Sequence, residues 1–191
     1  MRFSLRHAAE AAVLSLISAG LFAGFFRLNH LIFSALEHSQ GVNWIFLPAG
    51  FRVLLVLGMG LPGCVGIFLG NLYLDQKNLF TPDHAALTLM TAVVSGFTPW
   101  VVMNAMKYMH MLDASLQKLT HQQLLNFTLL YAAANAVFHQ MTWSLSNATT
   151  HRPWIEVWPM FTGDVLGAMI MLYAFKGLLN LFNRTSSGRS F

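Results

Sequence analysis

Long apolar stretches alternate with short polar segments along the whole chain of 191 residues. A helix needs about 20 mostly apolar residues to cross the hydrocarbon core of a bilayer. The pattern therefore predicts an all-α fold, a polytopic membrane helix bundle of about six transmembrane helices. The expected spans are residues 8–26, 44–57, 61–74, 84–110, 122–145 and 158–182.

The second and third spans come from one apolar stretch that is too long for a single span and too short for two full ones. Glycine and proline permit a tight turn where a regular helix stops. Several of them lie in the middle of this stretch: Gly58, Gly60, Pro62 and Gly63. Pro48 and Gly50 are expected to interrupt the second span near its start.

Two short motifs indicate where later helices begin. Thr81-Pro82-Asp83 is a typical helix start before the fourth span. Thr120, with Gln123 at the capping-box position, is expected to cap the fifth span.

Composition excludes an ordinary soluble domain. The chain is 55% hydrophobic and 9% charged, with a mean hydropathy of +0.54, whereas soluble domains carry roughly 25% charged residues. The net charge of +4 comes without a basic run, so membrane lipid is the expected partner and nucleic acid is not. A single cysteine, Cys64, excludes an intrachain disulfide. Residues 1–183 are interpreted as one transmembrane domain and residues 184–191 as a short cytoplasmic tail.

Lysine and arginine are unevenly distributed over the two faces that six spans would create. One face holds seven of them, namely Arg2, Arg6, Lys107, Lys118, Lys176, Arg184 and Arg189. The other face holds three, namely Arg27, Lys77 and Arg152. Because cytoplasmic segments retain positive charge, both termini are expected in the cytoplasm.

Three ionisable residues fall at similar depth within the expected spans. Such groups are costly in a bilayer unless they are paired or hydrated. Counted from the outer boundary at a helical rise of about 1.5 Å per residue, Arg52 lies about 12 Å deep, and His139 and Asp164 about 9 Å deep. The matching depths predict that the three groups converge in the outer half of the membrane.

Other features support a polar pocket open to the outside, with Arg52 and Asp164 as candidate ion-pair partners. Asn135 lies one turn from His139 on the same face. Irregular backbone at membrane depth is tolerated where it lines a cavity, and Pro48 and Thr162 mark such places. The predicted ligand-binding residues are Arg52, His139, Asp164, Asn135, Trp44, Pro48 and Thr162. The alternatives are that Arg52 and Asp164 only hold two helices together and that His139 is a packing residue.

No catalytic or metal-binding pattern is visible. The eight histidines show no pair at helical ligand spacing, and no nucleophile and base can be paired. The expectation is therefore a protein without enzymatic activity, cofactor or metal. Small residues recur at four-residue spacing, as in Gly20/Gly24 and Gly66/Gly70, which lets helices approach closely within the chain or against another protein.

Four segments resemble the MASE1 family of bacterial membrane-integral sensor domains. In order they are WIFLPAG at 44–50, GIFLGN at 66–71, LTHQQLLNF at 119–127 and FTGDVLGA at 161–168. The similarity covers roughly residues 41–182. The residues that match most specifically are Trp44, Pro48, Ala49 and Gly50 in the first segment, with Gly163, Asp164, Leu166 and Gly167 in the last. Arg52 is not part of the family pattern.

The resemblance implies a sensor in the bacterial cytoplasmic (inner) membrane. Family members commonly have about eight spans and precede histidine kinase, diguanylate cyclase or phosphodiesterase domains. Here six spans are expected and the sequence ends nine residues after Phe182. A signal is therefore expected to pass to a separate protein, a kinase or a cyclase.

Three functions remain open at this point. The first is a sensor or ligand-binding subunit that recognises a small molecule from the outer face. The second is the substrate-binding subunit of a transporter, because the six-span architecture also resembles the binding subunits of energy-coupling-factor vitamin transporters. The third is a structural subunit of a larger membrane complex.

Overall fold

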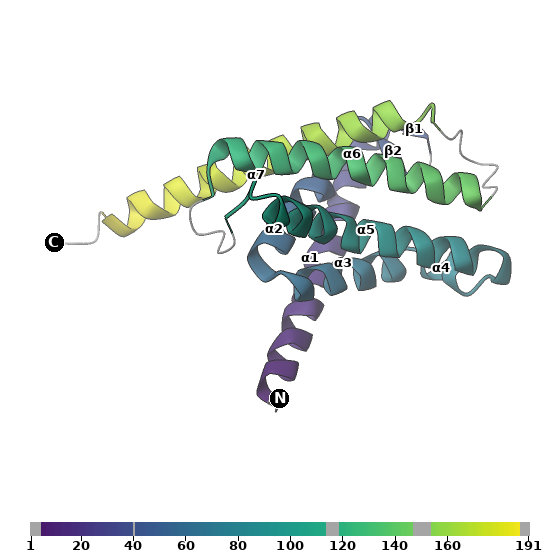
Figure 1. Ribbon diagram of the computed structural model, residues 1–191, viewed down its shortest axis with the longest axis horizontal. Coiled ribbons are helices and arrows are strands. Elements are labelled where there is room, and N and C mark those ends of the chain that lie inside the picture. The colour runs from purple at the N-terminus through teal and green to yellow at the C-terminus, as the bar shows by residue number, and fades with distance from the viewer. Residues whose placement is uncertain (1–4, 40, 114–118, 147–153, 188–191) are drawn as a thin grey trace.

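The computed structural model describes residues 5–39, 41–113, 119–146 and 154–187, and it is almost entirely helical (Figure 1). Helices occupy all six ranges in which spans are expected. The helices are α1 (Leu5–Phe33), α2 (Leu47–Met59), α3 (Leu61–Leu74), α4 (Gln76–Leu79), α5 (Pro82–Tyr108), α6 (His121–Leu145) and α7 (Val157–Ser187). A single 3-10 turn, η1 (Ser34–Leu36), follows α1 and leads into a two-stranded hairpin of β1 (Glu37–Ser39) and β2 (Val42–Asn43).

Two predicted helix starts and one predicted break are confirmed. Thr120 accepts a hydrogen bond from the Gln123 backbone at 3.2 Å, and the Gln123 side chain accepts one from the Thr120 backbone at 3.0 Å. α5 begins at Pro82, directly after Thr81. Between α2 and α3, Gly60 has a φ of 61°, a conformation that favours glycine because it has no Cβ.

The start of α2 differs from the expectation. Pro48 and Gly50 do not interrupt a helix, because α2 begins only at Leu47 and Pro48 lies in its first turn. Proline is tolerated there, since the first backbone N–H groups of a helix have no partner within it. One of them is satisfied from α1: the Leu47 N–H donates to the buried side-chain oxygen of Asn29 at 2.9 Å. Asn29 thus fixes where α2 begins.

Three helices are long and apolar enough to cross a membrane: α1, α5 and α7. α2 and α3 are shorter apolar helices of 13 and 14 residues, and α6 has 25 residues but carries more polar groups. Many large apolar side chains on these helices are exposed, among them Leu16, Ile17, Val93, Val101, Leu130 and Ile170. Exposed apolar surface on this scale identifies a membrane protein.

The segments that carry the family resemblance pack against one another through their glycines. A Cβ on Gly167 would overlap the Phe46 carbonyl oxygen, and one on Gly163 would overlap that of Asn43. The Phe46 N–H also donates to the Gly163 carbonyl at 3.0 Å. On the other side of this contact, a Cβ on Gly50 would lie 2.8 Å from the Cα of Ala168. These glycines therefore let α7 approach α2 and the segment before it.

Small residues also join α1 to α3. A Cβ on Gly66 would overlap Ser18, and one on Gly70 would lie 3.1 Å from the Ala19 carbonyl oxygen. By contrast, nothing lies within 4 Å of the Cβ positions of Gly20 and Gly24. The Gly66/Gly70 pair is thus used within the chain.

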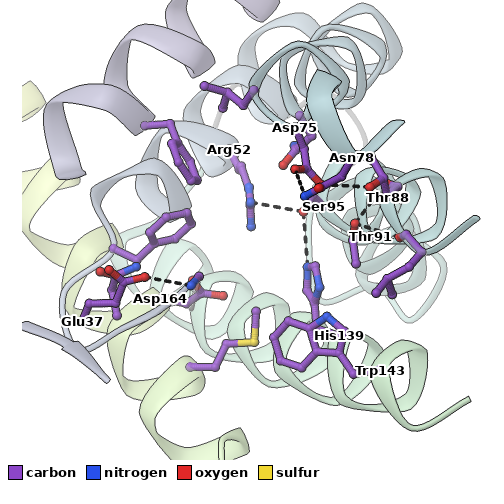
Figure 2. A pocket seen from close by; sticks show the side chains of 18 of the residues that line it. Glu37, Arg52, Asp75, Asn78, Thr88, Thr91, Ser95, His139, Trp143 and Asp164 are labelled. Carbon is purple, nitrogen blue, oxygen red and sulfur yellow. Dashed lines mark hydrogen bonds between the residues drawn. The ribbon is translucent and has the colours of Figure 1, made fainter. Parts of the chain in front are cut away.

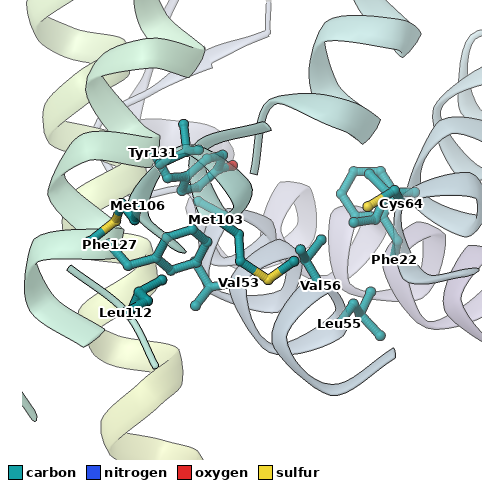
Figure 3. Close-up of a cluster of buried hydrophobic side chains, with 13 residues drawn as sticks. Phe22, Val53, Leu55, Val56, Cys64, Met103, Met106, Leu112, Phe127 and Tyr131 are labelled. Carbon is teal, nitrogen blue, oxygen red and sulfur yellow. The ribbon is translucent and has the colours of Figure 1, made fainter. Parts of the chain in front are cut away.

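A buried hydrophobic cluster holds α2, α3, α5 and α6 together (Figure 3). Its members come from α1, from α2 and α3, from the last residues of α5 and from the first turns of α6, and include Val53, Val56, Met103, Met106, Phe127 and Tyr131. Figure 1 shows that the first turns of α1 and the last turns of α7 project beyond this bundle. Residues 5–10 of α1 and residues 173–181 of α7 are exposed, which leaves both helices free to contact lipid or protein.

Candidate functional site

A polar cavity of about 570 Å³ lies at the end of the bundle formed by the hairpin, α4 and the adjoining ends of the long helices (Figure 2). Its exposed lining residues form the mouth, and they are Glu37, Gly41, Asn78 and His84. Its buried lining residues form the floor, and they are Arg52, Thr88, Ser95, His139, Trp143, Met160 and Asp164. The cavity is therefore wide at the surface and highly polar at its base.

The structure brings Arg52, His139 and Asp164 to this one cavity, as the matching depths predict. All three side chains are buried, with relative exposures of 3%, 5% and 1%. They come from α2, α6 and α7 respectively. The sequence-based comparison of depths thus identifies three residues that line one cavity.

Two aromatic rings and two hydroxyl groups hold the Arg52 guanidinium. The rings of Phe22 and Phe46 each have their centroid 5.2 Å from its central carbon. One terminal nitrogen donates to the Tyr131 hydroxyl at 3.2 Å, and the other donates to the Ser95 hydroxyl at 3.3 Å. All four partners are uncharged at neutral pH. They orient the guanidinium without neutralising its charge.

Ser95 links Arg52 to His139. Its hydroxyl lies 3.2 Å from Nε2 of His139 while it accepts the hydrogen bond from Arg52. A hydroxyl group can accept one bond and donate another. The three side chains therefore form a continuous hydrogen-bonded chain from α2 through α5 to α6.

The expected ion pair between Arg52 and Asp164 is absent. No nitrogen of Arg52 lies within 4.0 Å of an oxygen of Asp164. Asp164 instead accepts a hydrogen bond from the side-chain amide of Asn135 at 2.7 Å. The prediction of a direct ion pair is wrong because Ser95 and Tyr131 hold the guanidinium on one side and Asn135 holds the carboxylate on the other.

Asn135 lies behind the cavity rather than in its lining, and three other predicted residues also lie outside the lining. Trp44 is 42% exposed and packs edge-on against His38. Pro48 is buried in the first turn of α2. The Thr162 hydroxyl donates to the Trp158 carbonyl within α7. Depth along the sequence therefore does not by itself decide which side chains line the cavity.

A second polar row lines the cavity and is missing from the sequence prediction. Both oxygens of Asp75 are occupied: one accepts from Asn78 at 2.6 Å and the other from Thr88 at 2.9 Å. Along α5, Thr88, Thr91 and Ser95 share one face, because they are separated by three and four residues. That spacing of small hydroxyl residues is a signal from which the row could have been found.

The contacts of Ser95 and His139 can be compared with those of a hydrolase site. Ser95 and His139 are within hydrogen-bond distance, as a nucleophile and a base are in hydrolases, where a carboxylate orients the base. Here Asp164 accepts a hydrogen bond from Asn135, and the partly buried Asp75 accepts hydrogen bonds from Thr88 and Asn78. In the described residues no group of three or more His, Cys, Asp or Glu side chains could hold a metal ion.

No family model, curated protein or solved structure matches this chain.

Proposed function

We propose that this chain is a non-catalytic ligand-binding subunit of a bacterial cytoplasmic membrane. It recognises a small molecule from the outer face in the cavity between the hairpin and the ends of α5, α6 and α7. A change in occupancy alters helix packing, which a separate protein partner detects. The chain thereby acts as a sensor.

The observation that carries this proposal is the state of Arg52. Arg52 is 3% exposed, lines the cavity, and has no carboxylate of the described residues within 4.0 Å. A buried charge without a counter-charge costs several kcal/mol. Proteins retain such charges inside a membrane mainly where they bind an ion, a proton or a ligand. A negatively charged group on a ligand would supply the missing counter-charge.

The topology supports recognition from outside. The cavity is lined by the hairpin, by α4 and by the adjoining helix ends, and Lys77 of α4 belongs to the face with fewer positive charges. Helices of 13 and 14 residues are only roughly 20 Å long, less than the hydrocarbon core of about 30 Å. α2 and α3 either cross the membrane as two short spans or enter and leave it as a re-entrant pair. In both cases the end of α3 returns to the face from which α2 started. Either way, both termini lie in the cytoplasm.

The resemblance to the MASE1 family supports a sensing role. Its two most specific segments contact each other through Gly50, Gly163 and Gly167, and Asp164 connects this contact to the cavity. A ligand that moves Asp164 therefore moves α7 against α2. The last turns of α7 project from the bundle (Figure 1), and the exposed residues 173–181 offer a partner a surface on the cytoplasmic side.

The experiment is thermal unfolding of the detergent-purified protein with and without a low-molecular-weight extract of bacterial cells. The extract raises the Tm of the wild-type protein, by about 3–6 °C for a ligand at roughly ten times its Kd. Arg52→Met abolishes the rise. Thr128→Val is the matched control, because Thr128 is buried and bonds only within α6, to Leu124.

The unliganded Tm separates binding from a structural role of Arg52. If Arg52 serves a ligand, removing its unneutralised charge leaves the free energy of unfolding within about 1 kcal/mol of the wild type. If Arg52 only joins helices, the same change lowers it by about 3 kcal/mol or more. A wild-type protein that no extract stabilises, or an Arg52→Met protein that responds like the wild type, contradicts the proposal.

A further inference from the structure

We propose that the ligand is a zwitterion, whose anionic group binds Arg52 and whose cationic group binds Asp164. This inference rests on the proposed function and adds the chemical class of the ligand. It comes from the placement of two opposite, buried charges in one cavity without a direct contact between them (Figure 2).

Arg52 is prepared for an anion. Only its two terminal nitrogens make hydrogen bonds, one each, to Tyr131 and Ser95. Arginine carries five N–H donors, and its buried Nε has no hydrogen-bond partner among the described residues. A planar guanidinium with free donors binds carboxylates and phosphates through paired hydrogen bonds. The Phe22 and Phe46 rings, each with its centroid 5.2 Å from the central carbon, supply no hydrogen-bond acceptor for the remaining donors.

Asp164 is prepared for a cation. It is 1% exposed and lines the cavity, and within the described residues Asn135 is its single hydrogen-bond donor. Asp75 differs from Asp164, because both of its carboxylate oxygens already accept hydrogen bonds, one from Thr88 and one from Asn78. Asp164 keeps one oxygen for another donor. An ammonium group would supply both the hydrogen bond and the positive charge.

One molecule that carries both charges satisfies the cavity better than two separate ions or a single ion. An anion bound to Arg52 alone would leave Asp164 without a counter-charge and would be repelled by it. A cation bound to Asp164 alone would meet the same difficulty with Arg52. Charges in a site of low dielectric interact by several kcal/mol at about 4 Å, so both penalties are large.

The cavity is also large enough. Small-molecule sites are commonly about 300–1,000 Å³, and this cavity is about 570 Å³. The polar row of Thr88, Thr91 and Asp75 extends from the charged floor toward the mouth. It offers hydrogen bonds to the remainder of a ligand the size of an amino acid or a small peptide.

The rival explanation is a structural one, in which ordered water bridges Arg52 and Asp164. It predicts that the two charges stabilise each other, so that removing either one lowers stability and no charged ligand is distinguished. A second rival is a purely anionic ligand that uses Arg52 alone. Probes that differ by a single charge distinguish both rivals from the zwitterion proposal.

The test is isothermal titration of the purified protein with matched probes. The zwitterions are the standard amino acids together with β-alanine and γ-aminobutyrate, which separate the two charges progressively. For each one, the carboxylic acid without the amine and the amine without the carboxylate are the matched controls. The protein variants are Arg52→Met and Asp164→Asn, which removes the charge and keeps the shape, with Thr128→Val as the control.

We expect at least one zwitterion to bind the wild type about tenfold or more tightly than its matched acid and amine. In the Asp164→Asn protein the zwitterion no longer binds more tightly than its acid. In the Arg52→Met protein the zwitterion no longer binds more tightly than its amine. Thr128→Val changes neither difference in affinity. An acid that binds as tightly as its zwitterion, with no effect of Asp164→Asn, overturns the zwitterion proposal and leaves the proposed function standing. A panel in which no zwitterion binds also overturns it. The response of the protein to the cell extract then decides separately whether the proposed function stands.

Discussion

On α5 and α6, the cavity and the hydrophobic cluster are built from opposite ends of the same helices. On α5 the cavity residues lie between His84 and Ser95, and the cluster residues between Val102 and Met106. On α6 the order is reversed, because Phe127 and Tyr131 belong to the cluster and His139 to the cavity. We call these two regions the cavity end and the core end.

The difference between the two ends is how completely their groups are satisfied. The core end is apolar and closely packed, with Val53, Val56 and Phe127 fully buried. At the cavity end, Arg52 and Asp164 have polar neighbours but no counter-charge within 4.0 Å. Incomplete satisfaction costs stability, and it is characteristic of sites that are kept for function. The core end should therefore control stability, and the cavity end should control ligand binding.

The largest effect on stability is expected at the core end, from Phe127→Ala. Phe127 is 0% exposed and packs against the Tyr131 ring, so its removal leaves a cavity and lowers the free energy of unfolding by about 3–5 kcal/mol. The rise in Tm with ligand stays at its wild-type size. Leu130→Ala is the control, because Leu130 is 44% exposed on the same helix. Loss of the ligand response in a folded Phe127→Ala protein would show that the ends are not separable.

Gly167→Ala, where α7 meets the cavity wall, is expected to lower the free energy of unfolding by a smaller amount, about 3 kcal/mol. The added methyl group would overlap the Phe46 carbonyl oxygen, so α7 must move away from α2 and carry Asp164 with it. Both stability and ligand affinity fall, which distinguishes this position from Phe127. Gly177→Ala on the same helix has nothing within 4 Å of the new methyl. It stabilises the helix by up to about 1 kcal/mol. Equal Tm values for the two variants would contradict the close contact.

Sequence reasoning predicted the helices well because their signals are local. Apolar runs give the helix positions, Gly60 marks the break between α2 and α3, and Thr120 with Gln123 forms the capping box. Counting residues from the expected ends of the spans also identified Arg52, His139 and Asp164, which line one cavity. These properties depend on residues that are neighbours in the chain, so no knowledge of packing is needed.

The rest depends on how helices are rotated and placed beside one another. Trp44 and Thr162 do not line the cavity, because tertiary packing decides which side chains of a segment face it. The bond between Asp75 and Thr88 joins a polar connection to a helix and has no local signature. The hairpin at residues 37–43 is too short for an alternating pattern to reveal it.

The smallest change, Ser95→Ala, sharpens the comparison most, because it separates positioning from packing within the cavity end. Without the hydroxyl, Arg52 loses one of its two hydrogen bonds and its link to His139. A hydrogen bond of this kind contributes about 1 kcal/mol, which corresponds to roughly fivefold weaker binding of the tightest zwitterion in isothermal titration. The free energy of unfolding changes by less than about 1 kcal/mol, because Tyr131 and the aromatic rings still hold the Arg52 guanidinium.

Thr98→Val is the matched control on α5, since the Thr98 hydroxyl bonds only to the Val94 carbonyl of its own helix. Should Ser95→Ala instead destabilise the fold and leave affinity unchanged, the chain from Arg52 to His139 would be a structural contact between helices, and the two ends of the molecule would serve the same purpose.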